Sequence, residues 1–575
     1  MINKNIFRNA SYAFVLAVVF VLSGTAFAGP AEFVIVNINA PGIGFNDPTP
    51  ATPVGGNTGT TVGEQRLIAF EYAASLWSAR LDSNVPIRIR AQFTSLAAGV
   101  LGSAGPVGLS RDFPGAPLPG TWYYSALANK LAGVDLVPTS DDINANFSTN
   151  FSFYLGLDNN HGSQNDLVAV LLHEFAHGLG FSQQANVTTG VLFGSNTTGR
   201  FPDAYNTRMF DNVEGLYWKD MTNAQRAASA TRFGRVVLDA PLLNAGVPKV
   251  LSYGSPTVGV NSPASIAGPY QFGTAAFGPT LGNPTVSADV VAAVDAIEPA
   301  SPPTVPAAGT TTDGCSPFSN AAAVVGKIVL IERGFCGFAV KARNATDAGA
   351  AGVIVYNQAA NVNAAPAGMA DDGINGAFVT IPTVSIRRAD GLAIIAQLGT
   401  GVNATIGNDM SIRAGADLLG RARVYAPFPI VSGSSISHFD TAANRNVLME
   451  PAISPDLTHK LKAPDDLTSE FLYDIGWTFP DADGDSFVDD EDCNPNSNRA
   501  ATIVIDGNNS GVPNKLFDTG CTSSDLIANI AAGAGTHGDF VSGVASLTNS
   551  WSASGLITGR QKGAIQSAAA IARIP

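Results

Sequence analysis

Two histidines and a glutamate stand at a spacing that can hold and use a metal ion. His173, Glu174 and His177 lie in the segment Leu-Leu-His-Glu-Phe-Ala-His, which follows the pattern H-E-x-x-H. Residues four apart on a helix share one face, so both imidazoles can bind the same ion. Zinc suits neutral nitrogen ligands, and the Glu174 carboxylate can take a proton from water that the ion activates. The motif predicts a hydrolytic zinc site on a helix over residues 167–177.

The segment after this helix leaves the third zinc ligand open. Gly180 occupies the turn position of the longer pattern H-E-x-x-H-x-x-G-x-x-H, but the last position is Gln183, which is not an expected zinc ligand. Either the third ligand comes from a distant part of the chain, or the site is incomplete. The candidates are the other histidines and two carboxylates, namely His161, His438, His459, His537, Asp203 and Asp211.

One of these histidines has an informative setting. His438 stands in Gly-Ser-Ser-Ile-Ser-His-Phe-Asp, and Met449 follows in Val-Leu-Met-Glu-Pro. With the segment 466–477, this arrangement resembles leishmanolysin-type metzincin proteases over about residues 31–245 and 420–478. The resemblance implies zinc on His173, His177 and His438, Glu174 as the general base, and Met449 as the apolar floor beneath the metal.

A serine mechanism is the competing interpretation of the same loop, which contains Ser437, His438 and Asp440. Adjacent residues on one loop cannot readily form the geometry of nucleophile, base and orienting acid, and the pattern G-x-S-x-G is absent. The zinc mechanism is therefore the one we expect.

The middle of the chain carries a different pattern. Between residues 325 and 398 strand-like and helical segments alternate, with strands expected at 325–331, 353–356 and 378–386 and helices at 338–349 and 389–398. The segment from Gly326 through Arg333 and Cys336 to Phe338, together with 348–357 and 381–385, resembles the protease-associated (PA) domain. The resemblance implies an accessory domain of exported peptidases without catalytic residues; the alternative is a spacer.

An acidic run follows the segment that resembles the protease. Carboxylates occupy positions 1, 3, 5, 9 and 12 of a twelve-residue loop, namely Asp481, Asp483, Asp485, Asp489 and Asp492. This spacing can wrap oxygen ligands around calcium, although Ser486 and Asp492 depart from the glycine and glutamate of an EF-hand. The run predicts a calcium loop, and the alternative is a solvated acidic linker.

Composition and charge restrict the function classes. The 575 residues are 45% apolar and 14% charged, which is typical of a globular chain of several domains, and the net charge of −14 opposes binding to nucleic acid or anionic membranes. Residues 1–28 have the basic, apolar and small-residue order of a secretory signal peptide, and no later run is long enough for a membrane span. An oxidising exterior permits two disulfides, and proximity pairs Cys315 with Cys336 and Cys493 with Cys521.

These observations predict an α+β fold in which a metzincin-type catalytic domain is split by an inserted α/β PA domain and followed by a small, mostly helical domain. The expected ranges are a signal peptide at 1–28, catalytic parts at 29–247 and 415–478, an insertion at 248–414 with its core at about 310–405, an acidic linker at 479–495 and a C-terminal domain at 496–575. The expected function is a secreted zinc metalloendopeptidase acting on proteins or peptides. The alternative is a secreted binding protein with a structural or inactive metal site, but such a site has no need of Glu174.

Overall fold

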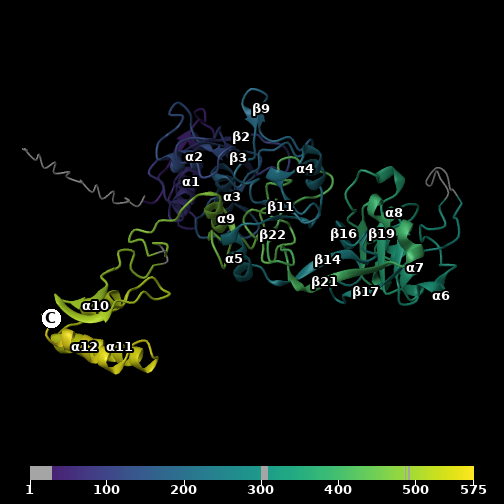
Figure 1. Ribbon diagram of the computed structural model, residues 1–575. Coiled ribbons are helices and arrows are strands. Elements are labelled where there is room, and N and C mark those ends of the chain that lie inside the picture. The colour runs from purple at the N-terminus through teal and green to yellow at the C-terminus, as the bar shows by residue number, and fades with distance from the viewer. Residues whose placement is uncertain (1–28, 300–308, 486, 490–491, 575) are drawn as a thin grey trace, which may run out of the picture. The chain divides into compact units, whose positions relative to one another are not determined.

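The computed structural model describes residues 29–299, 309–485, 487–489 and 492–574, and the predicted signal peptide lies outside the described residues. The chain divides into two compact units, residues 29–480 and residues 481–575. The first unit is a mixed α+β structure that contains both the helix with the H-E-x-x-H motif and the inserted region (Figure 1). In the described residues, no helix combines the length and the apolar character needed to cross a membrane.

A four-stranded sheet supports the motif helix. Its strand order is β1 (Phe33–Asn37), β2 (Ile87–Thr94), β6 (Ile143–Ser148) and β3 (Gly102–Pro106). The first three strands are parallel, whereas β3 runs antiparallel to β6 and forms the edge of the sheet. Alternate residues of β2 are buried, as expected for a strand with one face on the core.

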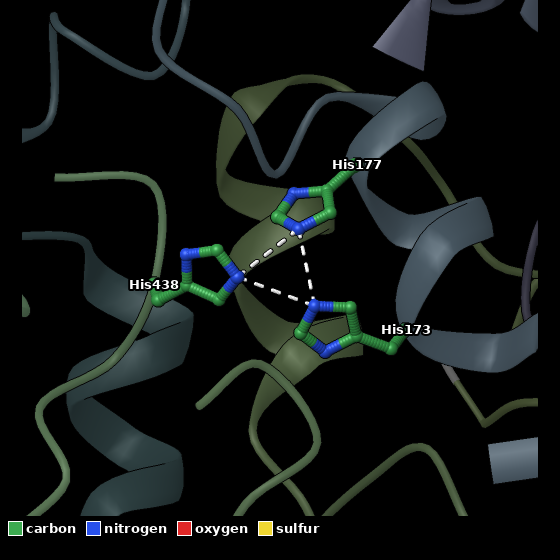
Figure 2. A group of neighbouring side chains, drawn as sticks. All are labelled: His173, His177 and His438. Atoms are coloured by element: carbon green, nitrogen blue, oxygen red, sulfur yellow. Dashed lines mark hydrogen bonds between the residues drawn. The ribbon is translucent and has the colours of Figure 1, made fainter. Parts of the chain in front are cut away.

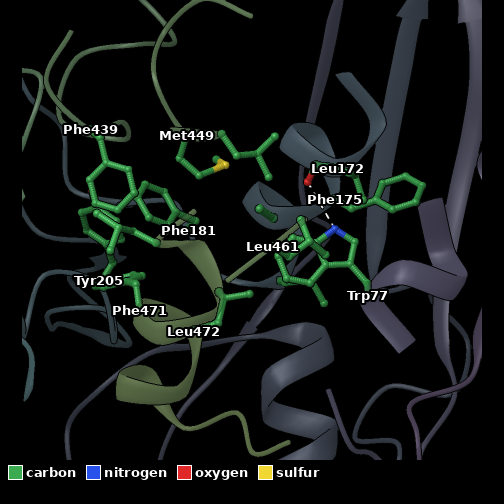
Figure 3. Packing of buried hydrophobic residues seen from close by; sticks show 14 of the residues in the cluster. Trp77, Leu172, Phe175, Phe181, Tyr205, Phe439, Met449, Leu461, Phe471 and Leu472 are labelled. Atoms are coloured by element: carbon green, nitrogen blue, oxygen red, sulfur yellow. Dashed lines mark hydrogen bonds between the residues drawn. The ribbon is translucent and has the colours of Figure 1, made fainter. Parts of the chain in front are cut away.

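Two helices cover the buried face of this sheet. Helix α1 (Val62–Ser78) begins with a capping box between Thr61 and Glu64 and contacts α3 (Leu167–Leu179). Every residue of α3 is buried, so its fixed position comes from packing on all sides. The Nε1 of Trp77 donates a hydrogen bond to the carbonyl of Leu172 at 3.2 Å and ties the two helices together (Figure 3).

Segments from before and after the insertion share one core. A second sheet has the order β12 (Leu216–Tyr217), β11 (Met209–Asp211), β13 (Val236–Leu238) and β22 (Ala422–Arg423). Helix α5 (Pro241–Val250) packs against α9 (Thr468–Ile475), whose Asp474 carboxylate accepts hydrogen bonds from the first turn of α5. The late segment 415–480 therefore completes the structure begun by residues 29–250.

The inserted region is built on an eight-stranded sheet with the order β15-β14-β21-β17-β18-β19-β20-β16, whose two edge strands are β15 (Gly268–Pro269) and β16 (Phe272–Thr274). Its long antiparallel pair is β14 (Tyr253–Ser262) and β21 (Asn403–Arg413), and its parallel strands are β17 (Val286–Ala292), β18 (Ile328–Glu332), β19 (Gly352–Tyr356) and β20 (Thr383–Ile386). Helices α7 (Phe338–Asp347) and α8 (Arg388–Gln397) belong to separate apolar clusters on opposite faces of these strands. This is the α/β alternation expected from the sequence.

The C-terminal unit combines a hairpin with three helices. Strands β23 (Thr502–Ile505) and β24 (Asn508–Pro513) pair, and α10 (Ser523–Gly533), α11 (His537–Ala553) and α12 (Gly559–Ala570) pack with them. Helical patterns at residues 525–532 and 561–572 predict α10 and α12, whereas the serines, glycines and threonines of α11 weaken its helical signal.

The structure contains both predicted disulfides, Cys315–Cys336 and Cys493–Cys521. The remaining short elements are β4 (Leu109–Ser110), β5 (Tyr123–Tyr124), α2 (Ser125–Ala132), β7 (Phe153–Tyr154), β8 (Asn165–Asp166), β9 (Gly194–Ser195), β10 (Gly199–Arg200), α4 (Asn223–Ser229) and α6 (Ala321–Val324).

Candidate metal centre

Helix α3 holds two histidines on one face and ends directly after them. The Asp166 side chain caps its start by accepting a hydrogen bond from the backbone of Val168 at 2.9 Å. The helix stops at Gly180, whose φ of 127° is open only to glycine, and a Cβ there would lie 2.8 Å from a methyl carbon of Ile475. This turn allows the carbonyl of Phe181 to reach the His177 ring.

A loop from the last part of the unit brings a third histidine to the helix. The backbone of His438 is fixed by a 2.9 Å hydrogen bond from the Tyr425 N–H to its carbonyl. Its ring lies within 3.2 Å of both helix histidines, measured between Nε2 atoms, and the two Nε2 atoms on the helix are also 3.2 Å apart (Figure 2). Three imidazoles from positions up to 265 residues apart therefore converge on one point.

The opposite ring nitrogens define how these histidines are protonated. Each Nδ1 lies close to one backbone carbonyl oxygen. His173 is 2.7 Å from Leu448 and His177 is 2.7 Å from Phe181. His438 is 2.8 Å from Ser434. A carbonyl only accepts, so each neutral ring carries its proton on Nδ1 and turns the lone pair of Nε2 to the centre. Three lone pairs that face one another repel unless a cation lies between them.

Electrostatics keeps the three rings neutral. Burial lowers the pKa of His173 to about 4, and burial and the neighbouring imidazole lower the pKa of His177 to about 3. Burial and both neighbouring rings hold the pKa of His438 well below its ordinary value. Zn–N bonds of about 2.0–2.1 Å at tetrahedral angles would place the nitrogens about 3.3–3.4 Å apart, close to the observed 3.2 Å. The donor set therefore fits zinc.

Glu174 lies beside this centre. Its side chain is buried, and burial raises the pKa of its carboxyl to about 8, while a hydrogen bond from the backbone of Ala104 on β3 opposes that rise. A cavity of about 500 Å³ is lined by Glu174, the three histidines and residues 99–104, with Val170, residues 432–434 and residues 451–453 completing its wall. The carboxyl group and the imidazoles thus face the same space.

Met449 directly follows the residue whose carbonyl contacts the His173 ring. It is fully buried in the main apolar cluster, and its carbonyl accepts a 2.8 Å hydrogen bond from the backbone of Phe439 (Figure 3). The neighbouring Leu448 carbonyl is the partner of the His173 ring. The turn with Met449 therefore positions a ring of the centre through its backbone.

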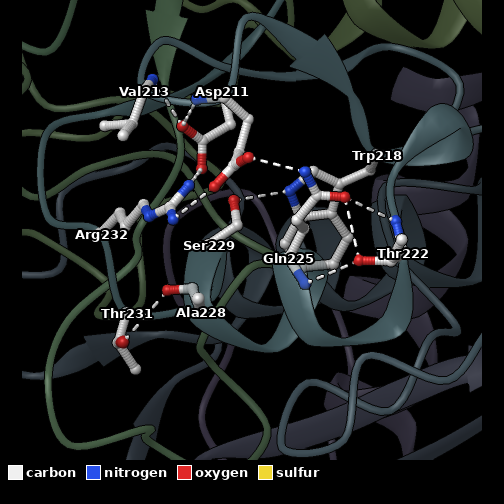
Figure 4. Close-up of polar contacts among 10 residues, drawn as sticks. Asp211, Val213, Trp218, Thr222, Gln225, Ala228, Ser229, Thr231 and Arg232 are labelled. Carbon is white, nitrogen blue, oxygen red and sulfur yellow. Dashed lines mark hydrogen bonds and ion pairs between the residues drawn. The ribbon is translucent and has the colours of Figure 1, made fainter.

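The two candidate carboxylates for the third ligand have other partners. Asp203 is fully buried and accepts hydrogen bonds from the backbones of Gln184 and Asn206. The carboxylate of Asp211 accepts from the Arg232 guanidinium at 2.8 Å (Figure 4). Neither carboxylate belongs to the group of possible metal ligands at the three histidines.

The other histidines are also placed elsewhere. His161 contacts the carbonyls of Gln164 and Pro455, and His459 pairs with Asp166 at 2.7 Å. His537 lies in the C-terminal unit. Both ring nitrogens of His438 face the Ser434 carbonyl and the other imidazoles, so Ser437 and Asp440 form no relay through it.

Some of the carboxylates in the acidic run lie close to one another. One oxygen each of Asp481, Asp483 and Asp485 lies within 4.8 Å of the others, and Asp485 Oδ2 is buried with no hydrogen-bond partner among residues 481–485, 487–489 and the other described parts of the chain. Asp489 and Asp492 are not in this group; they accept hydrogen bonds from the backbones of Ala482 and Asn494. Three of the five predicted calcium ligands are therefore clustered.

Sequence reasoning missed the contribution of β3. Its residues Gly-Ser-Ala-Gly-Pro include no β-branched or aromatic side chain and give no strand signal. The strand forms because it pairs with β6, from Gly102 opposite Phe147 to Pro106 opposite Ile143. Only this pairing places the Ala104 N–H beside Glu174.

Comparison with known proteins identifies one domain. The PA domain family matches residues 287–394, so the chain contains a PA domain, and the matched range covers all but the first residue of β17.

Three curated proteins match short segments. Human ER degradation-enhancing alpha-mannosidase-like protein 3 is 42% identical over 87 residues, 15% of this chain and 9% of that protein. An aminopeptidase of Pseudomonas aeruginosa is 52% identical over 52 residues, 9% of this chain and 10% of that protein. Leucine aminopeptidase 2 of Trichophyton rubrum is 36% identical over 89 residues, 16% of this chain and 17% of that protein. The chain thus spans less than a fifth of each relative.

Solved structures give similarly partial matches. A zinc aminopeptidase from Bacillus subtilis is 22% identical, with 29% of this chain and 36% of that chain covered and a TM-score of 0.19. An aminopeptidase from Aneurinibacillus sp. strain AM-1 is 16% identical, with 36% and 42% covered and a TM-score of 0.19. None of these likenesses supports the leishmanolysin-type resemblance, which stays a prediction from the sequence motifs.

Proposed function

We propose that this protein is an exported zinc-dependent peptidase that hydrolyses peptide bonds within protein substrates. The observation that carries the proposal is the convergence of three Nε2 lone pairs, each fixed by a backbone carbonyl on the opposite nitrogen, beside a buried carboxyl group. His173, His177 and His438 would hold the zinc. A bound zinc ion supplies Lewis-acid polarisation of the scissile carbonyl and lowers the pKa of water.

Glu174 is the proton carrier in this proposal. Without a cation, its burial favours the protonated carboxyl. A dication held by the adjacent imidazoles favours the carboxylate, which can accept a proton from the attacking water and return it to the leaving amine. Ala104 holds the side chain in place through its backbone N–H. A purely structural zinc site would have no use for this carboxylate, so Glu174 favours an enzyme over the binding-protein alternative.

The edge strand of the four-stranded sheet supports cleavage at internal bonds of a peptide substrate. Strand β3 is the last strand of its sheet, and residues 102–104 line the cavity. An edge strand can pair with an extended peptide through backbone groups, independently of the peptide's sequence or ends. This favours an endopeptidase.

The relatives named aminopeptidases raise the alternative of cleavage at a free N-terminus. A carboxylate that pairs with the substrate's ammonium group would select a free N-terminus. Among the described residues that line the cavity, Glu174 is the only carboxylate, and the proposal assigns it to proton transfer. The lining therefore lacks a separate anchor for a terminal amine.

Paired peptides with free and acetylated N-termini test this proposal. We expect equal cleavage at internal bonds of both peptides by the purified protein, and loss of cleavage with a zinc chelator that zinc restores. Cleavage restricted to the first bond of free peptides would show an aminopeptidase. Zinc binding without cleavage of any peptide or of casein would favour the binding-protein alternative.

A further inference from the structure

Three carboxylates lie close together in the PA domain, which is a separate part of the fold from the three histidines. Asp295 and Glu298 follow strand β17, and Asp313 lies in the loop that leads to Cys315. One oxygen from each carboxylate lies within 4.8 Å of the others. Asp295 and Asp313 are only 4% and 2% exposed, and Glu298 is half-buried. Three negative charges are thus removed from most of their water.

The hydrogen bonds of the loop leave carboxylate oxygens without a partner. Asp295 Oδ2 accepts from the backbone of Ser316 at 3.2 Å, whereas Asp295 Oδ1 is buried and has no hydrogen-bond partner among the described residues. Glu298 Oε1 accepts from the Ser316 hydroxyl, whereas Glu298 Oε2 is likewise buried and has no partner in the part of the chain that the structure describes. Buried oxygens of this kind cost free energy unless a donor or a cation reaches them.

A glycine leaves space where two of the carboxylates meet. A Cβ added to Gly309 would lie 2.7 Å from Glu298 Oε2 and 2.8 Å from Asp313 Oδ2. These two oxygens therefore turn toward the same small space over the Gly309 backbone. Any larger residue would fill that space and separate them.

The nearby lysine does not satisfy these oxygens. Lys341 is fully buried on α7, and all three carboxylates favour its charged form. Its ammonium group, however, donates to the carbonyls of Asp313 and Gly334 at 2.5 and 2.6 Å and contacts the Cys315 sulfur at 3.3 Å. An ammonium has three donors, so none is left for the carboxylates. One positive charge also leaves two of the three negative charges uncompensated.

We propose that Asp295, Glu298 and Asp313 form a calcium site in the PA domain. Carboxylate oxygens are hard ligands, and an irregular loop can supply the flexible geometry that calcium accepts and magnesium does not. The ion joins the segment after β17 to the loop that begins at Gly309. Because that loop continues into the Cys315–Cys336 disulfide, calcium and the disulfide together fix one corner of the domain.

Calcium titration of the full chain tests this site. The variants Asp481→Asn, Asp483→Asn and Asp485→Asn first remove the clustered carboxylates of the acidic run in the C-terminal unit, so that this run does not add to the measured calcium binding. Isothermal titration of this background with calcium alone, after removal of bound calcium and with zinc present, should give one ion per chain. Adding Asp295→Asn should raise the Kd by about tenfold or more.

A matched control carries an equivalent change elsewhere in the domain. Asp289→Asn removes an exposed carboxylate that pairs with Lys327, and it should leave the Kd unchanged. Glu298→Gln, at a half-exposed position, provides a second variant if Asp295→Asn does not fold; it should weaken binding, and the calcium-dependent rise in the unfolding temperature of the background should shrink with it. No binding by the background up to about 10 mM calcium, an unchanged Kd in both variants, or tighter binding of magnesium than of calcium would each overturn the proposal.

Discussion

Nδ1 of His173 lies 2.7 Å from the carbonyl oxygen of Leu448, a residue 275 positions later in the chain. This hydrogen bond fixes both the rotation and the protonation of a ring on α3 by means of the turn that contains Met449. Residues 29–250 and 415–480 thus both contribute to the candidate metal centre, because the later segment supplies His438 and also orients a histidine of the earlier segment.

Glu174→Gln should separate metal binding from catalysis. The amide keeps the size of the side chain but cannot accept the proton, so we expect kcat to fall by about 10²–10⁴ while zinc content stays near one ion per chain. Elemental analysis and peptide cleavage on the same preparation measure both quantities. Glu64→Gln, which alters an exposed helix cap, is the control and should keep full activity. Retained cleavage in Glu174→Gln would remove this residue from the mechanism.

His438→Ala should abolish tight zinc binding. It removes one of three imidazoles whose Nε2 atoms lie 3.2 Å apart, and two ligands do not hold zinc tightly. His161→Ala, which removes a ring that contacts only backbone carbonyls on the surface, should leave zinc bound. Competition with a chromogenic chelator gives both affinities. Equal affinities would place the third ligand elsewhere.

Met449→Ala should affect stability more than metal binding. Met449 is fully buried in the main cluster, so truncation leaves a cavity that costs about 2–5 kcal/mol, whereas Met449→Leu costs less than about 1.5 kcal/mol. Urea unfolding followed by tryptophan fluorescence compares the variants. We expect zinc content to persist in both folded variants, since the contact with His173 is made by the backbone of Leu448. Loss of zinc in folded Met449→Leu would contradict this expectation.

Glu450→Gln should change how stability depends on pH. Burial raises the pKa of Glu450 from 4.5 to about 8, so the folded chain keeps a proton that the unfolded chain releases above pH 4.5. The contribution of this group to the free energy of unfolding is present below pH 4.5 and is lost as the pH rises through 8, with a slope of at most about 1.4 kcal/mol per unit. Glutamine does not titrate, so the free energy of unfolding of the variant should increase relative to that of the wild type between pH 5 and 8. Parallel pH profiles of the unfolding temperature would disprove the assignment.

The acidic run of the C-terminal unit gives a second calcium prediction. Asp485 has a buried oxygen next to Asp481 and Asp483 that no described residue partners, so Asp485→Asn should weaken calcium binding in a chain that carries Asp295→Asn. Asp518→Asn alters an exposed carboxylate of the same unit and should have no effect. Calcium titration compares the two. If the solvated linker is the correct interpretation, both chains will show the same weak, nonspecific binding.

The sequence predicted the parts of the structure that have strong local patterns. The apolar run with H-E-x-x-H predicted α3, and the alternation of strands and helices predicted the core of the PA domain. Residue types and spacing alone did not select His438 among the six candidates for the third metal ligand. The loop that carries His438 is positioned by contacts with Tyr425 and with helix α3, which the sequence does not reveal. The cluster at Asp295, Glu298 and Asp313 has no regular spacing, and it forms because the segment after β17 contacts the loop before Cys315, as in the hydrogen bond from the Asp295 N–H to the Thr311 carbonyl.

The pairing of β14 with β21 bears on the order in which the chain folds. Tyr253 and Arg413 are register partners at the base of the PA domain, so a folded insertion already holds its two ends side by side. The loop that must close to join His177 to His438 then shrinks from 261 positions to about 100, which lowers the entropic cost of closure by about 0.8 kcal/mol. The insertion therefore favours a sequence of events in which the PA domain forms first and the three histidines meet last. Zinc could be captured only after that step, so its uptake would report completion of the fold.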